Sequence, residues 1–272
     1  MTTLYCRALE SASETPILVD PAAEELIAKL DPLLAPSRSA LHRQLLERRI
    51  DRRDAAFVAL RAARFDRCAL EFASRTRPSL IVNLGCGFDT RFQRIDDGEL
   101  QFLDVDRAEI IRLKRHLSAS GNRHRHIQAS VLETDWMSEI APTSSPPLFL
   151  AEGLLMYLPE DRVRALVLEI QARFPGAEFV TDVIDTRWLR PWIRWTIDVK
   201  LRWRYRFGKS ARFVSGLRNS RDMENWGEGI EYLREWCILD ESEPKSGLSR
   251  VLRRLEIARR LHRVVHYRLH PV

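Results

Sequence analysis

The fold of this chain is decided by the stretch Leu80-Ile81-Val82-Asn83-Leu84-Gly85-Cys86-Gly87-Phe88-Asp89-Thr90-Arg91. Its apolar start has the length of a buried strand, and a Gly-x-Gly turn follows at the strand's carboxyl end. Glycines at this point let a ligand approach the backbone where a side chain would block it. In an open α/β sheet, cofactors bind at that end of the strands. The stretch therefore predicts a nucleotide-type site.

A second expected strand, 101–106, ends in carboxylates. A strand, a glycine turn and an acid after the next strand are typical of a nucleoside site, in which the acid accepts hydrogen bonds from the ribose hydroxyls. Asp104 and Asp106 share one face of the strand because alternate residues do. Either acid could serve, and we favour Asp106.

The turn itself points away from a dinucleotide. A dinucleotide site has a third glycine, where this chain has Thr90, and Asp89 lies inside the turn. A carboxylate here would repel a pyrophosphate. It suits a cofactor with a cationic end, such as the ammonium group of S-adenosylmethionine.

Composition bounds the class of protein. A chain of 272 residues, with 30% charged and 45% hydrophobic residues, suits one large soluble domain. No apolar stretch reaches the ~18 residues that span a bilayer, and no secretory signal is visible, so we expect a cytoplasmic protein without a membrane role. The four cysteines are scattered without a C-x-x-C pair, which argues against a zinc site, and we expect no metal.

The net charge of +6 comes mostly from arginine. A basic chain raises the question of nucleic acid, but acids are interleaved with the arginines and no recognition motif accompanies them. We expect no nucleic acid partner. An acidic or planar small substrate explains the charge at least as well.

The chain is expected to form a single domain, 1–272, with four parts. Residues 1–75 are mainly helical, with a helix starting at Pro21 behind Asp20 as N-cap. The core, 76–186, alternates strands with helices near 107–119 and 160–173, and its strands are expected at 80–84, 101–106, 126–130, 147–151 and 177–183. This alternation predicts an α/β, Rossmann-like parallel sheet. An insertion, 187–235, and C-terminal strands with a basic helix at 248–260, within 236–272, complete the chain; the last two strands are expected to pair antiparallel.

Residues 187–213 interleave tryptophans and other aromatics with arginines. We interpret this segment as a lid over the carboxyl edge of the sheet. The alternative is a surface amphipathic helix.

Several motifs together resemble the leucine carboxyl methyltransferase family, and within it the bacterial branch typified by tetracenomycin-type polyketide O-methyltransferases. They are, in order, Arg7–Ser11, Arg61–Asp66, Asn83–Arg91, Asp104–Asp106, Ala129–Leu132 with Trp136, and Ala151–Leu158. The resemblance covers residues 4–185 well and the rest loosely. It implies a class I S-adenosylmethionine-dependent methyltransferase fold and S-adenosylmethionine as cofactor.

The resemblance also implies roles for single residues. Arg61 would pair with the methionine carboxylate of the cofactor, and Glu152 would lie beside its ammonium. Gly85 and Gly87, with Asp89 in their turn, would admit the methionine part, and Asp106 would bind the ribose. Val131 and Leu132 would flank the adenine. Tyr157 points toward the same pocket and is the candidate catalytic residue.

The expected reaction is O-methylation of a carboxyl or hydroxyl group on a small, acidic or aromatic metabolite, as in polyketide biosynthesis. A carboxylate acceptor needs no base, whereas a phenol or alcohol is helped by one. The chain has histidines at 116, 124, 126, 262 and 266, none of them in a catalytic motif, which favours an acid or an acidic phenol. Three alternatives remain: a protein carboxyl methyltransferase, a cofactor-binding protein without catalysis, and a nucleic-acid-binding protein. The oligomeric state is left open.

Overall fold

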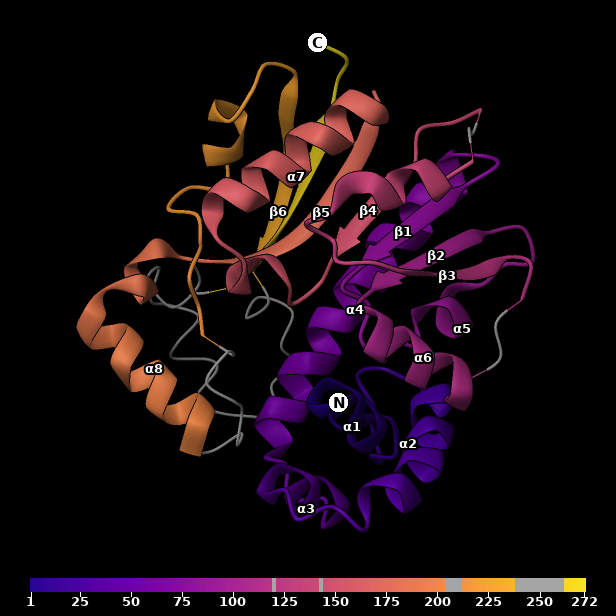
Figure 1. The fold of residues 1–272 in the computed structure, drawn as a ribbon, viewed down its shortest axis with the longest axis vertical. Helices are drawn as coiled ribbons and strands as arrows, with labels where there is room; N and C mark the ends of the chain where they lie inside the picture. The colour runs from indigo at the N-terminus through magenta and orange to yellow at the C-terminus, as the bar shows by residue number, and fades with distance from the viewer. Residues whose placement is uncertain (119–120, 142–143, 204–211, 238–261) are drawn as a thin grey trace.

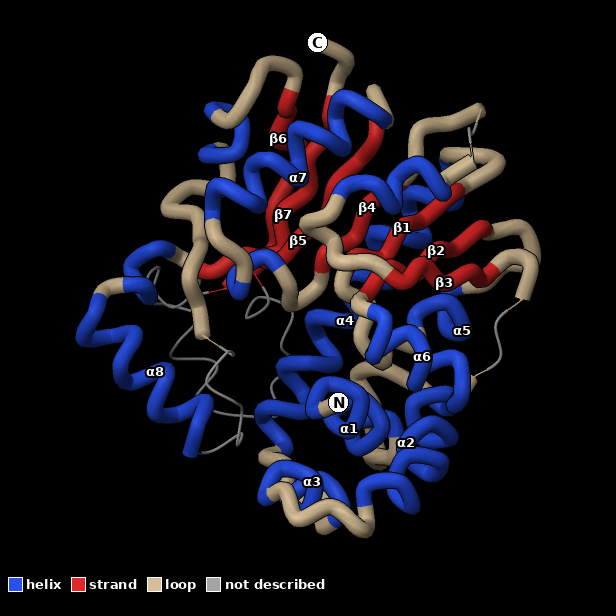
Figure 2. Tube along the Cα trace, viewed as in Figure 1, coloured by secondary structure: helices blue, strands red, loops and turns tan. Residues whose placement is uncertain are grey.

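The architecture is a seven-stranded sheet covered by helices on both faces (Figures 1 and 2). The computed structural model describes residues 1–118, 121–141, 144–203, 212–237 and 262–272. The strand order is β3-β2-β1-β4-β5-β7-β6. The strands are β1 (Leu80–Leu84), β2 (Gln101–Asp106), β3 (His124–Gln128), β4 (Leu148–Ala151), β5 (Ala177–Ile184), β6 (Ile230–Cys237) and β7 (His262–Leu269). The α/β expectation is confirmed.

The first five strands are parallel, and β7 is antiparallel to both β5 and β6. The expected antiparallel pairing of the last two strands is therefore confirmed. β3 lies two residues earlier than expected, because its ladder with β2 starts at the pair Phe102–His124 and ends at Asp106–Gln128. Ala129 and its successors are thereby free to form the loop that follows.

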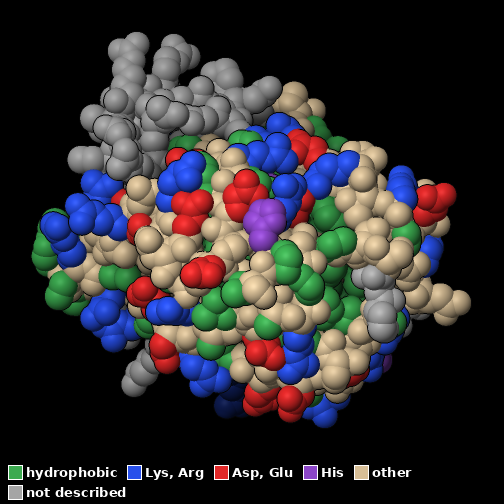
Figure 3. Space-filling view, turned by 90° about the horizontal axis from the view of Figure 1, so that it is seen from above, with side chains coloured by type: hydrophobic (Ala, Val, Ile, Leu, Met, Phe, Trp, Pro, Cys, Tyr) green, Lys and Arg blue, Asp and Glu red, His purple; other side chains and the backbone are tan. Residues whose placement is uncertain are grey.

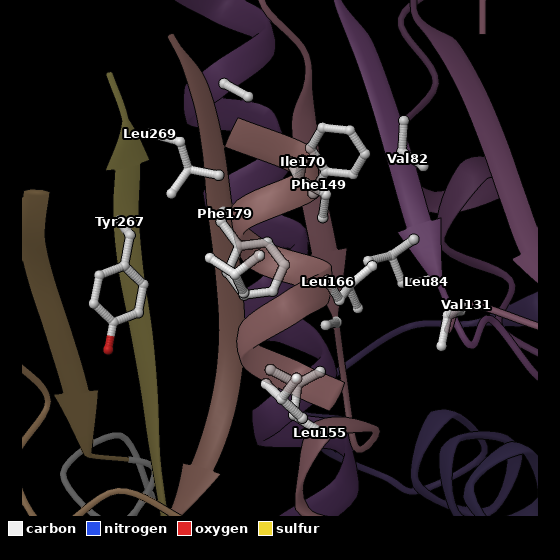
Figure 4. Packing of buried hydrophobic residues seen from close by; sticks show 14 of the residues in the cluster. Val82, Leu84, Val131, Phe149, Leu155, Leu166, Ile170, Phe179, Tyr267 and Leu269 are labelled. Atoms are coloured by element: carbon white, nitrogen blue, oxygen red, sulfur yellow. The ribbon is translucent and has the colours of Figure 1, made fainter. Parts of the chain in front are cut away.

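The helices and short 3-10 segments divide between the two faces and one edge of the sheet. They are α1 (Thr2–Ser11), α2 (Pro21–Leu34), α3 (Ala40–Leu46), α4 (Arg52–Arg75), α5 (Arg91–Ile95), α6 (Ala108–Leu117), η1 (Thr134–Glu139), η2 (Leu155–Tyr157), α7 (Glu160–Arg173), η3 (Thr186–Leu189), α8 (Pro191–Trp203) and η4 (Asp222–Asn225). On one face, α7 packs Leu166 and Ile170 against Phe149 and Phe179 of the strands (Figure 4). On the other face, α4 buries Phe65 and Phe72.

The N-terminal helices lie beyond the carboxyl edge of the parallel strands (Figure 1). The expected start of α2 is correct: Pro21 opens the helix and the side chain of Asp20 accepts a hydrogen bond from the backbone N–H of Ala23 at 3.0 Å. α4 is long enough to run from this edge along the sheet, so that Arg61 lies near the carboxyl ends and Arg75 reaches Glu178 on β5.

The C-terminal strands were expected within 236–272, but β6 begins earlier, at Ile230, because its ladder with β7 starts at the pair Ile230–Leu269. The helix expected at 248–260 lies outside the described residues. Among the residues that are described, no helix is long and apolar enough to cross a membrane.

α8 projects from the carboxyl edge, on the side of β5 (Figure 1). Trp192 and Trp195 on this helix are each 68% exposed. Beyond residues 204–211, which are not described, Phe213 lies against Tyr157 with ring centroids 5.3 Å apart. The backbone N–H of Val214 donates to the carbonyl of Met156 at 2.9 Å. The segment 187–213 thus has its C-terminal end next to the residues that follow β4.

Charges of both signs are mixed on the surface. Figure 3 shows lysines and arginines interleaved with acids across the face that is seen from the top of Figure 1. This mixing agrees with the pattern along the sequence.

Candidate functional site

The glycine turn after β1 is shaped by two left-handed residues. Gly85 has φ +61° and Gly87 has φ +52°, where a side chain is disfavoured. A Cβ atom on Gly85 would lie 2.7 Å from Cδ1 of Leu154, so the loops after β1 and β4 approach closely. A Cβ on Gly87 would meet no heavy atom within 4 Å among those described. The backbone at Gly87 therefore faces open space, as a ligand would require.

The acid after β2 is joined to this turn. Asp106 accepts a hydrogen bond from the Gly87 N–H at its Oδ2 (2.8 Å) and from the Arg107 N–H at its Oδ1 (2.7 Å), and it is only half-buried. Asp104 is instead buried and bound to Lys114 and His124, both at 2.7 Å. Of the two acids that the sequence leaves open, the geometry brings Asp106 to the turn.

Asp89 is held by Arg91, a residue that the sequence reasoning did not assign. Oδ2 of Asp89 accepts from Nη1 of Arg91 at 2.6 Å and from the Asn83 amide at 3.1 Å. Burial opposes ionisation of Asp89, but Arg91 and Arg94 outweigh it and lower its pKa. Asp89 is thus an ionised carboxylate whose direct neighbours are arginines.

Arg61 joins the loop after β4 to the end of β5. Its Nε lies 3.0 Å from Oε1 of Glu152 and its Nη1 lies 3.2 Å from Oδ2 of Asp182. Arg91 pairs with the other carboxylate oxygen of Glu152. Among the described residues these contacts use Nε and Nη1 of Arg61, and its Nη2 lies next to Gly153, where an added Cβ would be 3.1 Å away.

These residues belong to one continuous chain of buried ion pairs along the carboxyl edge. The pairs are Arg7–Asp20, Asp20–Arg94, Arg94–Asp66, Asp66–Arg91, Arg91–Asp89, Arg91–Glu152, Glu152–Arg61 and Arg61–Asp182, and His262 is hydrogen-bonded to the last of these carboxylates. Arg91 has a fully buried side chain. Fixed alternating charges in a water-poor site orient a charged ligand strongly, because they are weakly screened.

The remaining predicted residues lie at the same edge. Val131 is buried and Leu132 half-buried in the loop after β3, where the Trp136 indole N–H donates to the Val131 carbonyl at 3.4 Å. Tyr157 is half-buried in η2. Burial is the main cause that raises the pKa of its phenol, so the hydroxyl stays protonated near neutral pH.

His262 is a second residue to which the sequence reasoning gave no role. Its Nε2 lies 2.6 Å from Oδ2 of Asp182, and its ring stacks on Phe57 of α4 with centroids 5.2 Å apart. Asp182 and His262 are 80 positions apart in the chain. No local pattern in the sequence marks this pair.

A cavity of about 350 Å³ lies between α1, α3 and the start of α4. It is lined by apolar and polar groups, namely Thr2, Cys6, Leu41, Gln44, Leu45, Arg49, Ile50, Asp51 and Asp54. Cys6 is close to the ion-pair chain, since the charges of Arg7 and Arg61 act on it, although burial and Asp54 raise the pKa of its thiol to about 12. The volume suits a small molecule.

One cluster has the composition of a metal site. Ligand atoms of Asp104, His124 and His126 lie within 4.8 Å of one another among the described residues. The ammonium of Lys114 already contacts Oδ2 of Asp104 at 2.7 Å. The Lys114 ammonium of α6 is therefore already the cation that pairs with Asp104, and the cluster is a buried group of charges between α6 and the sheet.

The residues at the edge fit S-adenosylmethionine. The open backbone at Gly87 would leave room for the methionine part, Asp106 would offer carboxylate oxygens to the ribose hydroxyls, and Glu152 would offer a carboxylate to the ammonium. When bound, this cofactor supplies an electrophilic methyl group.

Comparison with known proteins identifies relatives of this chain. The family model described as leucine carboxyl methyltransferase matches residues 1–171. The tetracenomycin polyketide synthesis O-methyltransferase TcmP of Streptomyces glaucescens is 27% identical over 241 residues, covering 88% of this chain and 82% of that protein. An S-adenosyl-L-methionine-dependent methyltransferase of Gibberella zeae is 30% identical over 188 residues, covering 64% of this chain and 60% of that protein.

The fold has counterparts among solved structures. The magnesium protoporphyrin IX methyltransferase ChlM of Synechocystis, solved with bound S-adenosylhomocysteine, aligns with a TM-score of 0.52 at 8% identity, over 80% of this chain and 87% of that chain. Together with the strand order, this likeness shows the class I S-adenosylmethionine-dependent methyltransferase fold.

Proposed function

The chain belongs to the leucine carboxyl methyltransferase family and is an S-adenosylmethionine-dependent methyltransferase, and on that premise we propose that it O-methylates a small acidic or aromatic metabolite on a carboxyl or hydroxyl group. The observation that carries the proposal is the 350 Å³ cavity beside the ion-pair chain. It is large enough for a fused-ring aromatic, and it is bounded by α1 and α4, which also supply Arg7 and Arg61. A polyketide acceptor is consistent with the name of the Streptomyces glaucescens relative.

The cofactor is held, in this proposal, by residues of four loops. Arg61 binds the methionine carboxylate through its Nη2 group, and Glu152 lies beside the ammonium. Asp106 accepts from the ribose hydroxyls, and Val131 with Leu132 flanks the adenine. Asp89 acts through Arg91, which it keeps oriented toward Glu152.

We propose that part of 187–213 closes over the acceptor. The contact between Phe213 and Tyr157 supports this, because it ties the end of the segment to the loop that carries Glu152. Enclosure would exclude water from the transferring methyl group and orient the acceptor, and orientation supplies most of the acceleration in such a displacement.

Transfer of radioactivity from methyl-tritiated S-adenosylmethionine tests the function. A panel of naphthols, hydroxyanthraquinones and naphthoic acids is incubated with the enzyme, and a bacterial protein extract is incubated in parallel. We expect label in the organic-soluble products. Label that appears only in acid-precipitated protein, and is released by base, would point to a protein carboxyl acceptor instead.

A further inference from the structure

His262 and Asp182 form a hydrogen-bonded pair at the carboxyl edge of the sheet. β7 begins at His262, which faces Ile184 across the ladder, and Asp182 faces Val264. Asp182 is fully buried, which disfavours its charge, but Arg61 and His262 outweigh burial and lower its pKa. An ionised carboxylate can only accept hydrogen bonds, so Nε2 of His262 donates to it at 2.6 Å. In the neutral imidazole, Nδ1 is then the basic nitrogen.

We propose that His262 is the general base of the methyl transfer, that Asp182 is its positioning residue, and that the acceptor group is therefore a hydroxyl. The inference rests on the function proposed above. It departs from the sequence-based preference for an acid, which relied on the lack of a histidine in a catalytic motif. In this pair a carboxylate holds the histidine in one tautomer, as a third group orients the base in other active sites.

Asp182 links the His262–Asp182 pair to the proposed cofactor site. This carboxylate also contacts Arg61 at 3.2 Å and accepts from the backbone N–H of Gly153 at 2.6 Å, next to Glu152. One carboxylate thus connects His262 to the two groups that we propose for the methionine end of the cofactor. The His262 side chain remains 13% exposed, whereas that of Asp182 is fully buried.

The reaction step balances as a displacement with proton removal. Nδ1 of His262 takes the proton of the acceptor hydroxyl while an oxygen lone pair forms the new bond to the methyl carbon. The methyl–sulfur bond breaks and its electron pair stays on sulfur, which leaves neutral S-adenosylhomocysteine. The imidazolium that forms is stabilised by Asp182 until it gives its proton to water.

A carboxylate acceptor would make this arrangement superfluous. Carboxylic acids are ionised near neutral pH, whereas phenols ionise near pH 10, so only a hydroxyl benefits from a base. General base catalysis contributes on the order of 10²–10⁴-fold in rate. The loss of rate on removing a general base is thus large enough to be measured with a single substitution.

A second histidine–carboxylate pair on the same strand provides the control. His266 lies 2.7 Å from Glu178, and Arg75 and Arg268 also contact that carboxylate. This pair is four residues further along β7, away from the carboxyl edge, and His266 has a side chain only 2% exposed. It has the same chemistry as the His262–Asp182 pair but no access to a ligand.

The kinetic test compares His262→Asn, Asp182→Asn and His266→Asn on naphthols and the matched naphthoic acids. We expect methyl ethers as products, a loss in kcat of about 100-fold or more in His262→Asn with an unchanged KM for S-adenosylmethionine, and an unchanged kcat in His266→Asn. The rise of kcat with pH should disappear in His262→Asn. The charged groups that face His262 are Asp182 from β5 and, through it, Arg61 from α4. Tyr157 after β4 also titrates, so Tyr157→Phe tests whether the rise of kcat with pH comes from its hydroxyl. Methyl esters as products, or naphthol turnover that survives in His262→Asn, would overturn the proposal.

A structural test decides the matter without turnover. In a crystal of the S-adenosylhomocysteine complex, Nδ1 of His262 should face the space beside the sulfur and have no protein donor. An Nδ1 that is bonded to a protein group, or turned behind Phe57, would overturn the proposal even if no panel member is methylated. Calorimetry of S-adenosylhomocysteine with wild type and His262→Asn separates failure of the base proposal from failure of the proposed function. Equal binding by both proteins leaves the proposed cofactor site intact, while no binding by wild type would refute the proposed function itself.

Discussion

Asp106 accepts a hydrogen bond from the backbone N–H of Gly87 at 2.8 Å, so the end of β2 is tied to the turn after β1. The carboxylate that we propose for the ribose is oriented by the protein before any ligand arrives. Its Oδ1 is also bonded to the Arg107 N–H, and the remaining lone pairs on both oxygens are available to hydroxyl groups.

Asp106→Ala should weaken S-adenosylmethionine binding by roughly ten- to a hundred-fold. Loss of a charged hydrogen-bond partner costs on the order of 1.5–3 kcal/mol. Isothermal calorimetry measures the change, and Glu109→Ala, an exposed acid on the neighbouring α6, is the control. Wild-type affinity in a folded Asp106→Ala would move the ribose role elsewhere.

Arg61→Ala should lower both cofactor affinity and stability. The substitution removes the proposed carboxylate partner, and it leaves Glu152 and Asp182 without one of their cations. Breaking a buried pair in this way costs about 3–5 kcal/mol. Urea unfolding and calorimetry measure the two effects, with Arg67→Ala on the exposed side of α4 as control. Unchanged stability would contradict the ion-pair chain.

Gly85→Ala should destabilise the protein more than Gly98→Ala. Both glycines have positive φ, so each substitution brings backbone strain on the order of 1–3 kcal/mol. Only at Gly85 does the new Cβ also approach a side chain, with Leu154 Cδ1 at 2.7 Å, whereas at Gly98 no atom lies within 4 Å. Melting temperatures of the two variants give the difference, and equal values would show that Leu154 moves without cost.

Acid should destabilise the fold through carboxylates such as Asp104. Burial opposes the charge of Asp104, but Lys114 and His124 hold its pKa well below the usual 3.8. A folded pKa below the unfolded one gives stability that is full above about pH 5 and is lost as pH falls below 3.8 and through the folded value. The urea midpoint of the wild type should fall between pH 7 and pH 3. The midpoint of Asp104→Asn should be lower at pH 7 and should fall by less over the same range. The exposed Asp161→Asn is the control, and parallel curves for Asp104→Asn and wild type would exclude this contribution.

Tyr157→Phe should retain the wild-type kcat on any methylated naphthol, because the ring packs on Phe213 and burial keeps the phenol protonated. Tyr157→Ala should instead raise the KM of the acceptor, since it removes the surface on which Phe213 rests. A loss of kcat in Tyr157→Phe of tenfold or more would give the hydroxyl a direct part in the reaction.

The sequence predicts what local signals encode. The ranges of β1 and β2, the start of α2 behind Asp20 and the place of Asp106 beside the turn all follow from short patterns of glycine, proline and apolar residues. β3 was predicted two residues too late because its register is set by pairing with β2, and this pairing cannot be read from the sequence of one strand.

The sequence does not reveal which arginines are buried. Arg7 and Arg91 look like ordinary charged residues, yet they are 3% and 1% exposed because their partners come from other elements. His262 and Asp182 illustrate the same limit, since an 80-residue separation is closed only by the sheet. Part of the positive charge that seemed to suit an external partner is therefore used inside the fold.

The position of β7 has a consequence for the nascent chain. β7 follows every other strand in the sequence but lies between β5 and β6, so β5 is an open edge until residues 262–269 have been synthesised. An open edge is a template for pairing with another molecule, and buried charges on a strand discourage such pairing. Glu178 and Asp182 place two carboxylates on β5, and β7 brings His266 and His262 to meet them. Carboxylates on the strand that waits longest for its partner are the kind of charge that discourages such pairing.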